Sequence, residues 1–304
     1  MIGTRGSKLA LWQAEHVAGS LRGSFSGCAV RLETIKTTGD KILDVPLAQV
    51  GGKALFVKEI EEALLAGQVD LAVHSMKDVP TELPAGLVIA AVGQREDPLD
   101  VLISRTGARL ADLPRGARVG TSSLRRQAQL LHHRHDFIMV GLRGNLDTRI
   151  RKLQEEGLDA IVVAAAGVKR LGLAPLITEA LPTEILLPAI GQGALGIEIR
   201  QGHPTATAAV TILDHAETHL AVRTERAMLA RLEGGCQVPI AAHATVSGGE
   251  ITLRGLVASL DGRRLVRGEM RGTAEDSEAL GSRLAEDLLS RGAAEILHEI
   301  YARG

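Results

Sequence analysis

The sequence is poor in aromatic residues and carries no excess of charge of either sign. One Trp, one Tyr and three Phe occur among 304 residues, so the core must be aliphatic, and a single-stranded nucleic acid would find few rings for base stacking. The net charge is -1, which excludes a molecule-wide field for holding nucleic acid or an anionic membrane. Any cationic site must therefore be local.

Long apolar runs and cysteines are also scarce. The longest apolar run, residues 160–168, is well short of the roughly 20 residues that cross a bilayer, and the N-terminal residues show no features of an export signal. Cys28 and Cys236 are too few for a disulfide framework and form no CxxC pair for zinc. The contiguous HHRH string at 132–135 lacks metal-site spacing and predicts a polar helix end. We therefore expect a protein of the reducing cytoplasm, outside the membrane and without a metal.

The first two thirds of the chain have an α/β pattern. Short aliphatic runs alternate with amphipathic helical segments, which is typical of βαβ units, and the length favours two domains, or three if one is small. The strings GTRGS at 3–7 and GTSS at 120–123 each stand between a short strand and a helix. We therefore expect two related lobes that face each other across a cleft. Residues 1–95, completed by about 194–212, would form the first lobe, and residues 99–189 the second.

Several segments of these lobes have a clear local pattern. Residues 53–67 predict a helix, because apolar residues recur every four positions up to a terminal glycine. Residues 69–73 predict a buried strand that runs into a loop at 74–80, and residues 159–167 predict a second buried strand. The glycine-rich string at 191–196 lacks the strand, loop and helix order of a dinucleotide site, so close approach of two backbone segments explains it better.

From about residue 214 the pattern changes to that of a small α+β domain, residues 214–304. A turn of Asp and Gly at 261–262 separates two predicted strands, 251–258 and 263–272, and residues 242–246 are expected to supply a third strand. Apolar residues at helical spacing then predict two final helices.

Cationic side chains cluster where predicted strands run into helices. A cation there faces the positive end of the helix dipole, at a cost of roughly a few tenths of a kcal/mol unless an anion lies alongside, and free N–H groups at the same ends also bind anions. Arginine suits carboxylates because its planar fork bonds both oxygens. The residues in this pattern, with the hydroxyls beside them, are Arg5, Ser7, Thr121, Ser123, Arg125, Arg126, Arg143, Arg149 and Arg170.

Two explanations of these arginines stay open from the residues alone. Any single one is equally well explained by pairing with a surface Asp or Glu. Their repetition at strand ends, where α/β folds bind ligands, favours a ligand that carries several carboxylates or phosphates.

Two further positions are candidates for chemistry. Asp78, beside Lys77 in the loop after a predicted strand, can exchange protons or stabilise a developing cation, although a turn aspartate is the commoner explanation. Cys236 lies in LEGGCQVPI, where two glycines and a proline define a bent loop that exposes the sulfur. A lone cysteine is more often inert, and no nucleophile signature surrounds this one, so its sulfur is a candidate attachment point.

The order and spacing of several strings resemble one known family. Over nearly its whole length the chain resembles the hydroxymethylbilane synthases, also called porphobilinogen deaminases, and the part beyond the cysteine loop is the least distinctive. The strings that carry the resemblance are GTRGSKLALWQA, GGKALFVKEIE, DLAVHSMKDVP, VGTSSLRRQAQL, LRGNLDTRI, AAGVKRLGL, LPAIGQGALGIE and LEGGCQVPI.

The resemblance implies a fold, a reaction and a cofactor. The fold is two periplasmic-binding-protein-like α/β lobes around a cleft, with a small C-terminal α+β domain. The reaction is that of a cytoplasmic, monomeric transferase, which joins four porphobilinogen molecules head to tail, with loss of ammonia, into the linear tetrapyrrole hydroxymethylbilane. The cofactor is a dipyrromethane made from the same substrate and attached to Cys236 through a thioether. It stays behind as a primer when the product is released.

The family's motif positions also imply a role for each matching residue. Asp78 matches the catalytic carboxylate, which stabilises the cations formed as ammonia leaves and as the next ring attacks. A glycine-rich segment at 40–55, with Lys53, is expected to act as a lid. The matches for cofactor binding are Cys236, Lys77, Thr121, Ser123, Arg125 and Arg126, and those for binding the acetate and propionate groups of the substrate are Arg5, Ser7, Arg143, Arg149 and Arg170.

Two other functions compete with this one. A non-catalytic solute-binding or effector-binding protein would also have paired α/β lobes with a polar cleft, but it has no use for Cys236. Nucleic-acid binding through the arginines conflicts with the near-neutral net charge and the scarcity of aromatic residues. We therefore expect a small-molecule substrate and no nucleic-acid partner.

Overall fold

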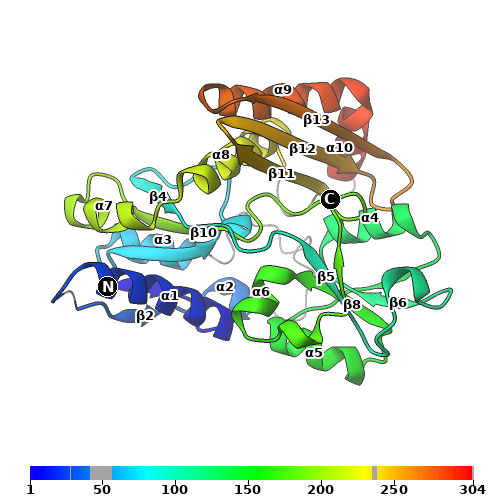
Figure 1. Ribbon diagram of the computed structural model, residues 1–304, viewed down its shortest axis with the longest axis horizontal. Coiled ribbons are helices and arrows are strands. Elements are labelled where there is room, and N and C mark those ends of the chain that lie inside the picture. Colours follow the sequence, from blue (N-terminus) through cyan, green and yellow to red (C-terminus); the bar gives the residue numbers. More distant parts are fainter. Residues whose placement is uncertain (28, 42–56, 235–237, 303–304) are drawn as a thin grey trace.

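The computed structural model describes residues 1–27, 29–41, 57–234 and 238–302, which form three units (Figure 1). Two α/β lobes lie beside each other, and a smaller domain with a three-stranded sheet covers both of them at the top of this view. This arrangement confirms the predicted class of two α/β lobes with a small C-terminal α+β domain. Among the described residues, no helix combines the length and the apolar character needed to span a membrane.

The first lobe has a five-stranded sheet of order β2-β1-β3-β10-β4. Strands β2, β1 and β3 are parallel, whereas β10 runs antiparallel to both of its neighbours. Helix α1 covers this sheet through the buried side chains of Ala14, Val17 and Leu21. The elements of the lobe are β1 (Ile2–Thr4), α1 (Lys8–Ser24), β2 (Leu32–Thr34), α2 (Thr38–Lys41), α3 (Lys58–Leu65), β3 (Leu71–Ser75), β4 (Leu87–Val92), β10 (Leu195–Arg200) and α7 (Pro204–Val210).

The second lobe repeats this plan with the strand order β7-β6-β8-β5-β9. Strands β7, β6 and β8 are parallel, and β5 is antiparallel to β8 and β9. The strings GTRGS and GTSS begin at the ends of β1 and β6, which hold the same place in their sheets. The prediction of two similar lobes is therefore confirmed. The elements are β5 (Asp100–Ser104), β6 (Arg118–Gly120), α4 (Leu124–His133), β7 (Ile138–Val140), α5 (Leu146–Glu155), β8 (Ala160–Ala164), α6 (Ala165–Arg170) and β9 (Glu179–Leu181).

The chain passes between the lobes twice, at 93–99 (the first crossover) and at 182–194 (the second crossover). The antiparallel strands β5 and β10 bring both crossovers to the edges where ligands are expected. In an antiparallel pair, the first residues of one strand lie beside the last residues of the other. Asp100, the first residue of β5, pairs with Ala164, and Leu195, the first residue of β10, pairs with Ser75. The carboxyl ends of the parallel strands and the two crossovers therefore share one edge in each lobe.

The local predictions for the first lobe are correct in type and differ in extent. The helix predicted at 53–67 is α3, with Ile60 and Leu64 buried, while residues 53–56 lie outside the described part of the chain. The strand predicted at 69–73 is β3 and begins two residues later. The segment predicted as a loop at 74–80 therefore starts as strand and continues into a single 3-10 turn, Met76–Asp78.

The strand predicted at 159–167 is wrong beyond Ala164. Ala165 is already the first residue of α6, which makes Arg170 the last residue of a helix, whereas the sequence pattern placed it where a strand runs into a helix. Strand β8 has by then paired with the whole of β5, and alanine has the highest helix propensity of all residues. In contrast, the HHRH string does end a helix, because α4 finishes at His133.

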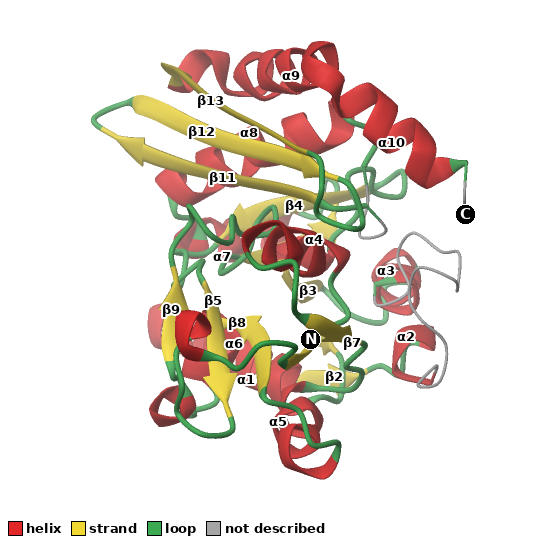
Figure 2. Cartoon of the chain, turned by 90° about the vertical axis from the view of Figure 1, so that its right-hand side faces the viewer, coloured by secondary structure: helices red, strands yellow, loops and turns green. Residues whose placement is uncertain are grey.

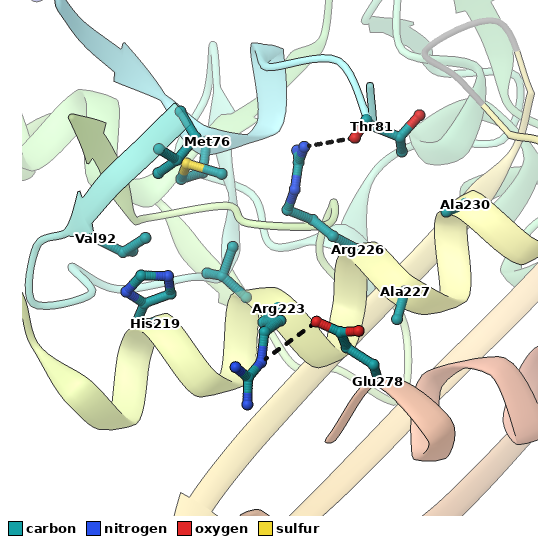
Figure 3. Close-up of a pocket in the computed structure, with 11 residues that line it drawn as sticks. Met76, Thr81, Val92, His219, Arg223, Arg226, Ala227, Ala230 and Glu278 are labelled. Atoms are coloured by element: carbon teal, nitrogen blue, oxygen red, sulfur yellow. Dashed lines mark hydrogen bonds and ion pairs between the residues drawn. The ribbon is translucent and has the colours of Figure 1, made fainter. Parts of the chain in front are cut away.

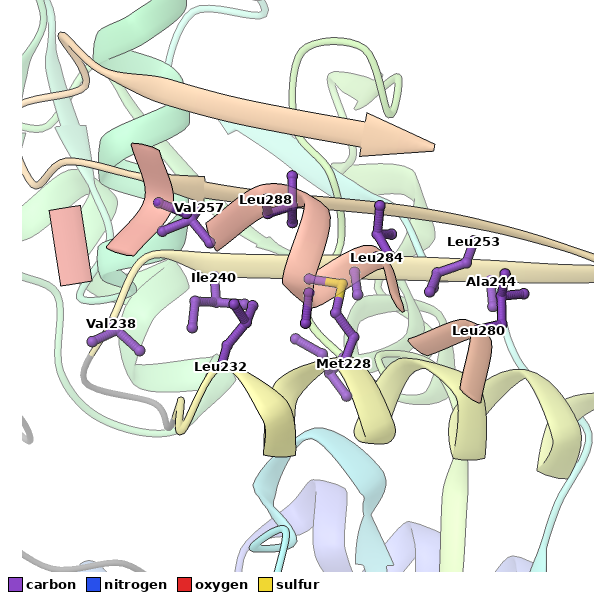
Figure 4. Packing of buried hydrophobic residues seen from close by; sticks show 14 of the residues in the cluster. Met228, Leu232, Val238, Ile240, Ala244, Leu253, Val257, Leu280, Leu284 and Leu288 are labelled. Carbon is purple, nitrogen blue, oxygen red and sulfur yellow. The ribbon is translucent and has the colours of Figure 1, made fainter. Parts of the chain in front are cut away.

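The C-terminal domain packs helices against one face of an antiparallel sheet of order β11-β12-β13. Met228 of α8 and Leu284 of α9 meet over Leu253 and Ile240 of the sheet, so the aliphatic core predicted from the composition is largest here (Figure 4). The predicted third strand and the two final helices are confirmed. The elements are α8 (Ala216–Arg231), β11 (Ile240–Ser247), β12 (Glu250–Ala258), β13 (Leu265–Thr273), α9 (Ser277–Leu288) and α10 (Ala294–Tyr301).

The glycine-rich string at 191–196 lies where the second crossover enters the first lobe. A Cβ atom on Gly193, which has φ 90°, would lie 2.2 Å from the backbone oxygen of Glu96, and one on Gly191 would lie 2.7 Å from the Cβ of Met76. Only glycine allows both the positive φ and this contact. The predicted close approach of backbone segments is therefore confirmed.

Candidate functional site

The candidate site lies between the facing edges of the two lobes. The turn after β3 comes from the first lobe, and the segments after β6 and β7 come from the second. Helix α4, which follows β6, is held from above by the C-terminal sheet, since Ala128 is buried against Ala241 and Leu256 (Figure 2). All three units therefore contribute to the position of the site.

The turn Met76–Asp78 presents one cation and one carboxylate. Met76 is buried and anchors the turn, Lys77 is half-buried, and the side chain of Asp78 is exposed. Burial lowers the pKa of Lys77 to about 8, and the positive charge of Arg126 acts in the same direction, against the opposing effects of Asp78 and Asp100. Among the described residues, the carboxylates of Asp78 and Asp100 thus do not offset the burial of Lys77 and the neighbouring charge of Arg126.

Arg125 and Arg126 both bond to a carboxylate that the sequence did not single out, Asp100. Nη1 of Arg125 donates to Asp100 Oδ2 at 2.8 Å, and Nε and Nη2 of Arg126 donate to Asp100 Oδ1 at 2.9 and 2.7 Å. All three side chains are buried. Burial alone would raise the pKa of Asp100, but the charges of the two arginines outweigh it and hold this pKa well below its ordinary value. The partner of these arginines is therefore a buried acid, and the surface pairing considered from the sequence is wrong for them.

Gln192 joins this carboxylate to the turn of the other lobe. Its Nε2 donates to Asp100 Oδ1 at 3.0 Å and to the backbone oxygen of Pro98 at 2.7 Å, and its Oε1 accepts from Nζ of Lys77 at 3.4 Å. The side chain is buried. The amide of Gln192, a residue of the second crossover, therefore bonds to Pro98 of the first crossover. It also connects Lys77 of the first lobe with Asp100 of the second.

Arg143 and Arg149 add further positive charge on the side of the second lobe. Nε of Arg149 donates to the backbone oxygen of Gly144 at 2.8 Å, which holds its side chain against the loop after β7. Burial, together with the charges of Arg126 and Arg143, lowers the pKa of Arg149 to about 10, although Asp78 acts in the opposite direction. The arginines that the sequence placed at separate strand ends are thus close enough to influence one another.

The predicted hydroxyl residues lie at helix N-termini, as expected. Ser7 accepts from the backbone N–H of Ala10 at 3.3 Å and caps α1, and Thr121 Oγ1 accepts from the backbone N–H of Ser123, the residue that precedes α4. These bonds shape the ends of the helices. Any ligand contact by these hydroxyls remains a prediction.

The remaining predicted residues lie around this group or outside the described part of the chain. Arg5 directly follows β1, on the same sheet edge as the turn after β3. Nη2 of Arg170 donates to the backbone oxygen of Gly193 at 2.7 Å, and its guanidinium lies 5.8 Å from the ring centre of Trp12. The two cysteines lie outside the described residues, and so does the predicted lid at 40–55, with Lys53, from residue 42 onward.

Sequence reasoning missed Asp100 and Gln192, the two residues that organise the buried charges. Asp100 precedes a run of aliphatic residues and looks like an ordinary strand boundary. A detectable signal was the pair of adjacent arginines, Arg125 and Arg126, because two buried guanidinium groups at a helix N-terminus require a carboxylate nearby. Which carboxylate supplies it depends on the antiparallel pairing of β5 with β8.

We predict that Asp100→Asn destabilises the protein strongly. The amide leaves two buried guanidinium groups without their counterion, which is expected to cost about 3–5 kcal/mol of unfolding free energy. Asp159→Asn is the matched control, because Asp159 forms an ion pair with the exposed Arg105, and such pairs contribute about 1 kcal/mol or less. Denaturation midpoints measure both, and an equal effect of the two substitutions would contradict the assignment.

Two solved structures align loosely with this chain. A TRAP periplasmic solute-binding protein from Desulfovibrio salexigens covers 70% of each chain, with 13% identity and a TM-score of 0.42. The periplasmic aliphatic sulphonate-binding protein SsuA from Escherichia coli covers 76% of this chain and 69% of its own, with 16% identity and a TM-score of 0.39.

Family models and curated relatives agree with each other. The model described as "Porphobilinogen deaminase, dipyromethane cofactor binding domain" matches residues 1–208, and "Porphobilinogen deaminase, C-terminal domain" matches residues 219–290. Proteins named porphobilinogen deaminase from Pelobacter propionicus and Geobacter metallireducens are each 60% identical to this chain over 302 residues. The alignments cover 99% of this chain and 97% and 95% of those proteins. The resemblance seen in the motifs is confirmed, and the chain belongs to the porphobilinogen deaminase family.

Proposed function

We propose that this protein is a hydroxymethylbilane synthase, which condenses four porphobilinogen molecules head to tail, with loss of ammonia, into the linear tetrapyrrole hydroxymethylbilane. The observation that carries the proposal is a surplus of positive charge around Asp78. Among the described residues, the carboxylates that interact with these cations are those of Asp78 and Asp100. The cations are Lys77, Arg125, Arg126 and Arg149. Porphobilinogen and its oligomers carry an acetate and a propionate on every ring, so they supply the missing anions.

The described residues fit a dipyrromethane cofactor. Lys77 and Arg149 are desolvated cations with lowered pKa values, and carboxylate groups are the anions that would stabilise their charges. When bound, the dipyrromethane supplies the pyrrole carbon to which the first porphobilinogen is joined. Cys236, the proposed attachment residue, lies outside the described residues.

Residues of the second lobe form most of the proposed cofactor site. Asp100 fixes the guanidinium planes of Arg125 and Arg126, and both groups keep N–H donors for further carboxylates, since arginine has five. Lys77 approaches from the first lobe, while Thr121 and Ser123 add hydrogen-bonding groups at the start of α4. Fixed donors cost little reorganisation when the ligand binds.

The carboxylates of the incoming substrate and the growing chain are assigned to the surrounding cations. Arg143 and Arg149 would bind them from the second lobe, and Arg5 and Ser7 from the end of β1 in the first. Arg170, at the end of α6 beside the second crossover, completes this set. Bidentate binding by arginine would fix the orientation of each pyrrole ring as well as its charge.

Asp78 is the proposed catalytic residue. Its carboxylate is exposed, and it adjoins Lys77 at the edge where the cations gather. It would lie near the pyrrole nitrogen and stabilise the positive charge that develops on the substrate as ammonia leaves and as the next ring attacks. The surrounding cations bind the acidic groups and so leave Asp78 to face that developing charge.

Domain limits, location and assembly complete the proposal. Residues 1–95 with about 194–212, residues 99–189 and residues 214–304 would be the three structural units, which agrees with the sheets to which their strands belong. The family resemblance supports a cytoplasmic monomer. The near-neutral net charge of -1 and the aromatic content of 2% are the reasons to expect no nucleic-acid partner.

Asp78→Asn is predicted to lower turnover by about 10²- to 10³-fold, the range for loss of one group that stabilises developing charge in the transition state. The fold should persist because the side chain is exposed. Asp112→Asn is the control, since Asp112 is also exposed and also ends a single 3-10 turn. Rates of hydroxymethylbilane formation and thermal melts measure both, and a near-normal rate for Asp78→Asn would remove it from the mechanism.

Cys236→Ser is predicted to yield protein without attached pyrroles. Oxygen in place of sulfur removes the proposed thioether, so intact mass should drop by two pyrrole units and the acid Ehrlich colour should disappear. Cys28→Ser is the control and should keep both. If the parent protein has a bare chain mass, the competing non-catalytic binding protein is favoured instead.

Lys77→Met, introduced into the Cys236→Ser protein, is predicted to raise stability near pH 7. A lysine whose folded pKa is about 8 binds protons less well in the folded than in the unfolded chain. Its contribution is therefore unfavourable below pH 8, and stability recovers as the pH rises from about 8 to 10.5. At about 1.4 kcal/mol per pKa unit, the gain from Met is roughly 3 kcal/mol at most. Denaturation midpoints against pH test this, and a gain that is the same at pH 7 and pH 10 would contradict it.

A further inference from the structure

Arg226 of helix α8 bonds to the backbone directly after the turn that carries Asp78. Its Nη1 donates to the carbonyl oxygen of Val79 at 3.0 Å, and its Nη2 donates to the carbonyl oxygens of Pro80 and, at 3.2 Å, Thr81. Figure 3 shows the side chain reaching from α8 toward this segment. One guanidinium group therefore holds three consecutive carbonyls.

These carbonyls belong to irregular backbone between β3 and β4, where no strand of the described residues supplies hydrogen-bond donors. Half-buried carbonyls require donors, and the planar fork of arginine can serve several at once. No carboxylate in the described part of the chain forms an ion pair with Arg226. Its charge is directed at the carbonyl oxygens, which makes these hydrogen bonds stronger than neutral ones.

The same face of α8 anchors the turn on its other side. Val222, one helical turn before Arg226, is buried with Met76, Val79 and Val92. Beside this apolar contact lies a pocket of about 320 Å³, lined by Met76, Thr81 and Arg226 among others (Figure 3). Packed side chains therefore support only part of the turn, and the guanidinium group supplies the directional contact next to the open space.

We propose that Arg226 is a positioning residue, which holds the backbone of residues 79–81 so that the carboxylate of Asp78 stays fixed toward the reacting pyrrole. The inference rests on the proposed function of Asp78 and extends it to the C-terminal domain. Displacement of a reacting group by about 1 Å can cost 10²-fold in rate, so a contact to the backbone that directly follows Asp78 has a measurable effect. Helix α8 also ends five residues before Cys236 in the sequence, which connects the proposed attachment point with the proposed catalytic turn.

The test compares Arg226→Met, which keeps the stem and removes every donor, with Arg226→Lys, which keeps one charged donor group. Arg223→Met is the matched control, because Arg223 lies one turn earlier on α8 and bonds to Ser277 instead. We expect Arg226→Met to lower kcat by about 10- to 100-fold, with KM changed less than threefold and the pyrrole adduct retained in intact mass. Arg226→Lys should recover part of kcat, and Arg223→Met should leave it unchanged.

Three results would overturn the proposal. The first is a kcat of Arg226→Met within twofold of the parent, and the second is a rise in the KM of Arg226→Met at constant kcat. The third is a loss of kcat in Arg223→Met equal to that in Arg226→Met. If Arg226→Met does not fold, Arg226→Lys decides: a kcat within twofold of the parent overturns the proposal, and a lower kcat with an unchanged Tm supports it. Asp78→Asn is measured in parallel. An active Asp78→Asn refutes the proposed function, whereas an active Arg226→Met beside an inactive Asp78→Asn refutes this inference alone.

Discussion

The arrangement of the site depends on one buried carboxylate, that of Asp100, between two buried guanidinium groups. Without it, Arg125 and Arg126 would repel each other and the positive end of the α4 dipole in a region with little water. With it, both guanidinium planes are fixed, while the two arginines and the one carboxylate together keep a net charge of +1. This combination suits anion recognition, because the donors are rigid and the group still attracts negative charge.

Similar buried polar bonds connect the site with the rest of the molecule. Glu225 of α8 accepts two hydrogen bonds from Arg95 of the first crossover, one from the backbone N–H of Gly191 in the second crossover, and one from Ala244 in β11. Burial would raise its pKa, but Arg95 and His243 bring it down to about 2. The relation between the lobes and the C-terminal domain is therefore set by directional ionic bonds. Helix α8 takes part in these bonds and also holds the turn after β3.

The sequence predicts the class of the fold and most residues of the candidate site, because both depend on local sequence patterns. Strand ends, helix caps and the arginines beside them are features of a few adjacent residues, and the order of the motifs identifies the family. The pairing of Asp100 with Arg125 and Arg126 is different, because it depends on an antiparallel strand that enters the lobe from outside. The bonds from Arg226 to residues 79–81 also join segments about 145 residues apart in the sequence. The early end of β8 at Ala164 was missed because an alanine-rich run fits a buried strand and a helix equally well.

The two lobes share one plan but contribute unequal chemistry. The edge of the first lobe supplies the turn with Asp78, whereas the edge of the second supplies most of the cations, including the pair fixed by Asp100. Under the proposed function, every added ring brings the same two acidic groups, so each condensation presents the same charges to the site. The single carboxylate of Asp78, in the turn held by α8, can then act on successive rings, provided that the bound pyrrole oligomer moves past it by exchanging its contacts with the arginines. Such a reaction requires a catalytic group that stays in place, which the first lobe supplies, and sites that bind successive carboxylates, most of which the second lobe supplies.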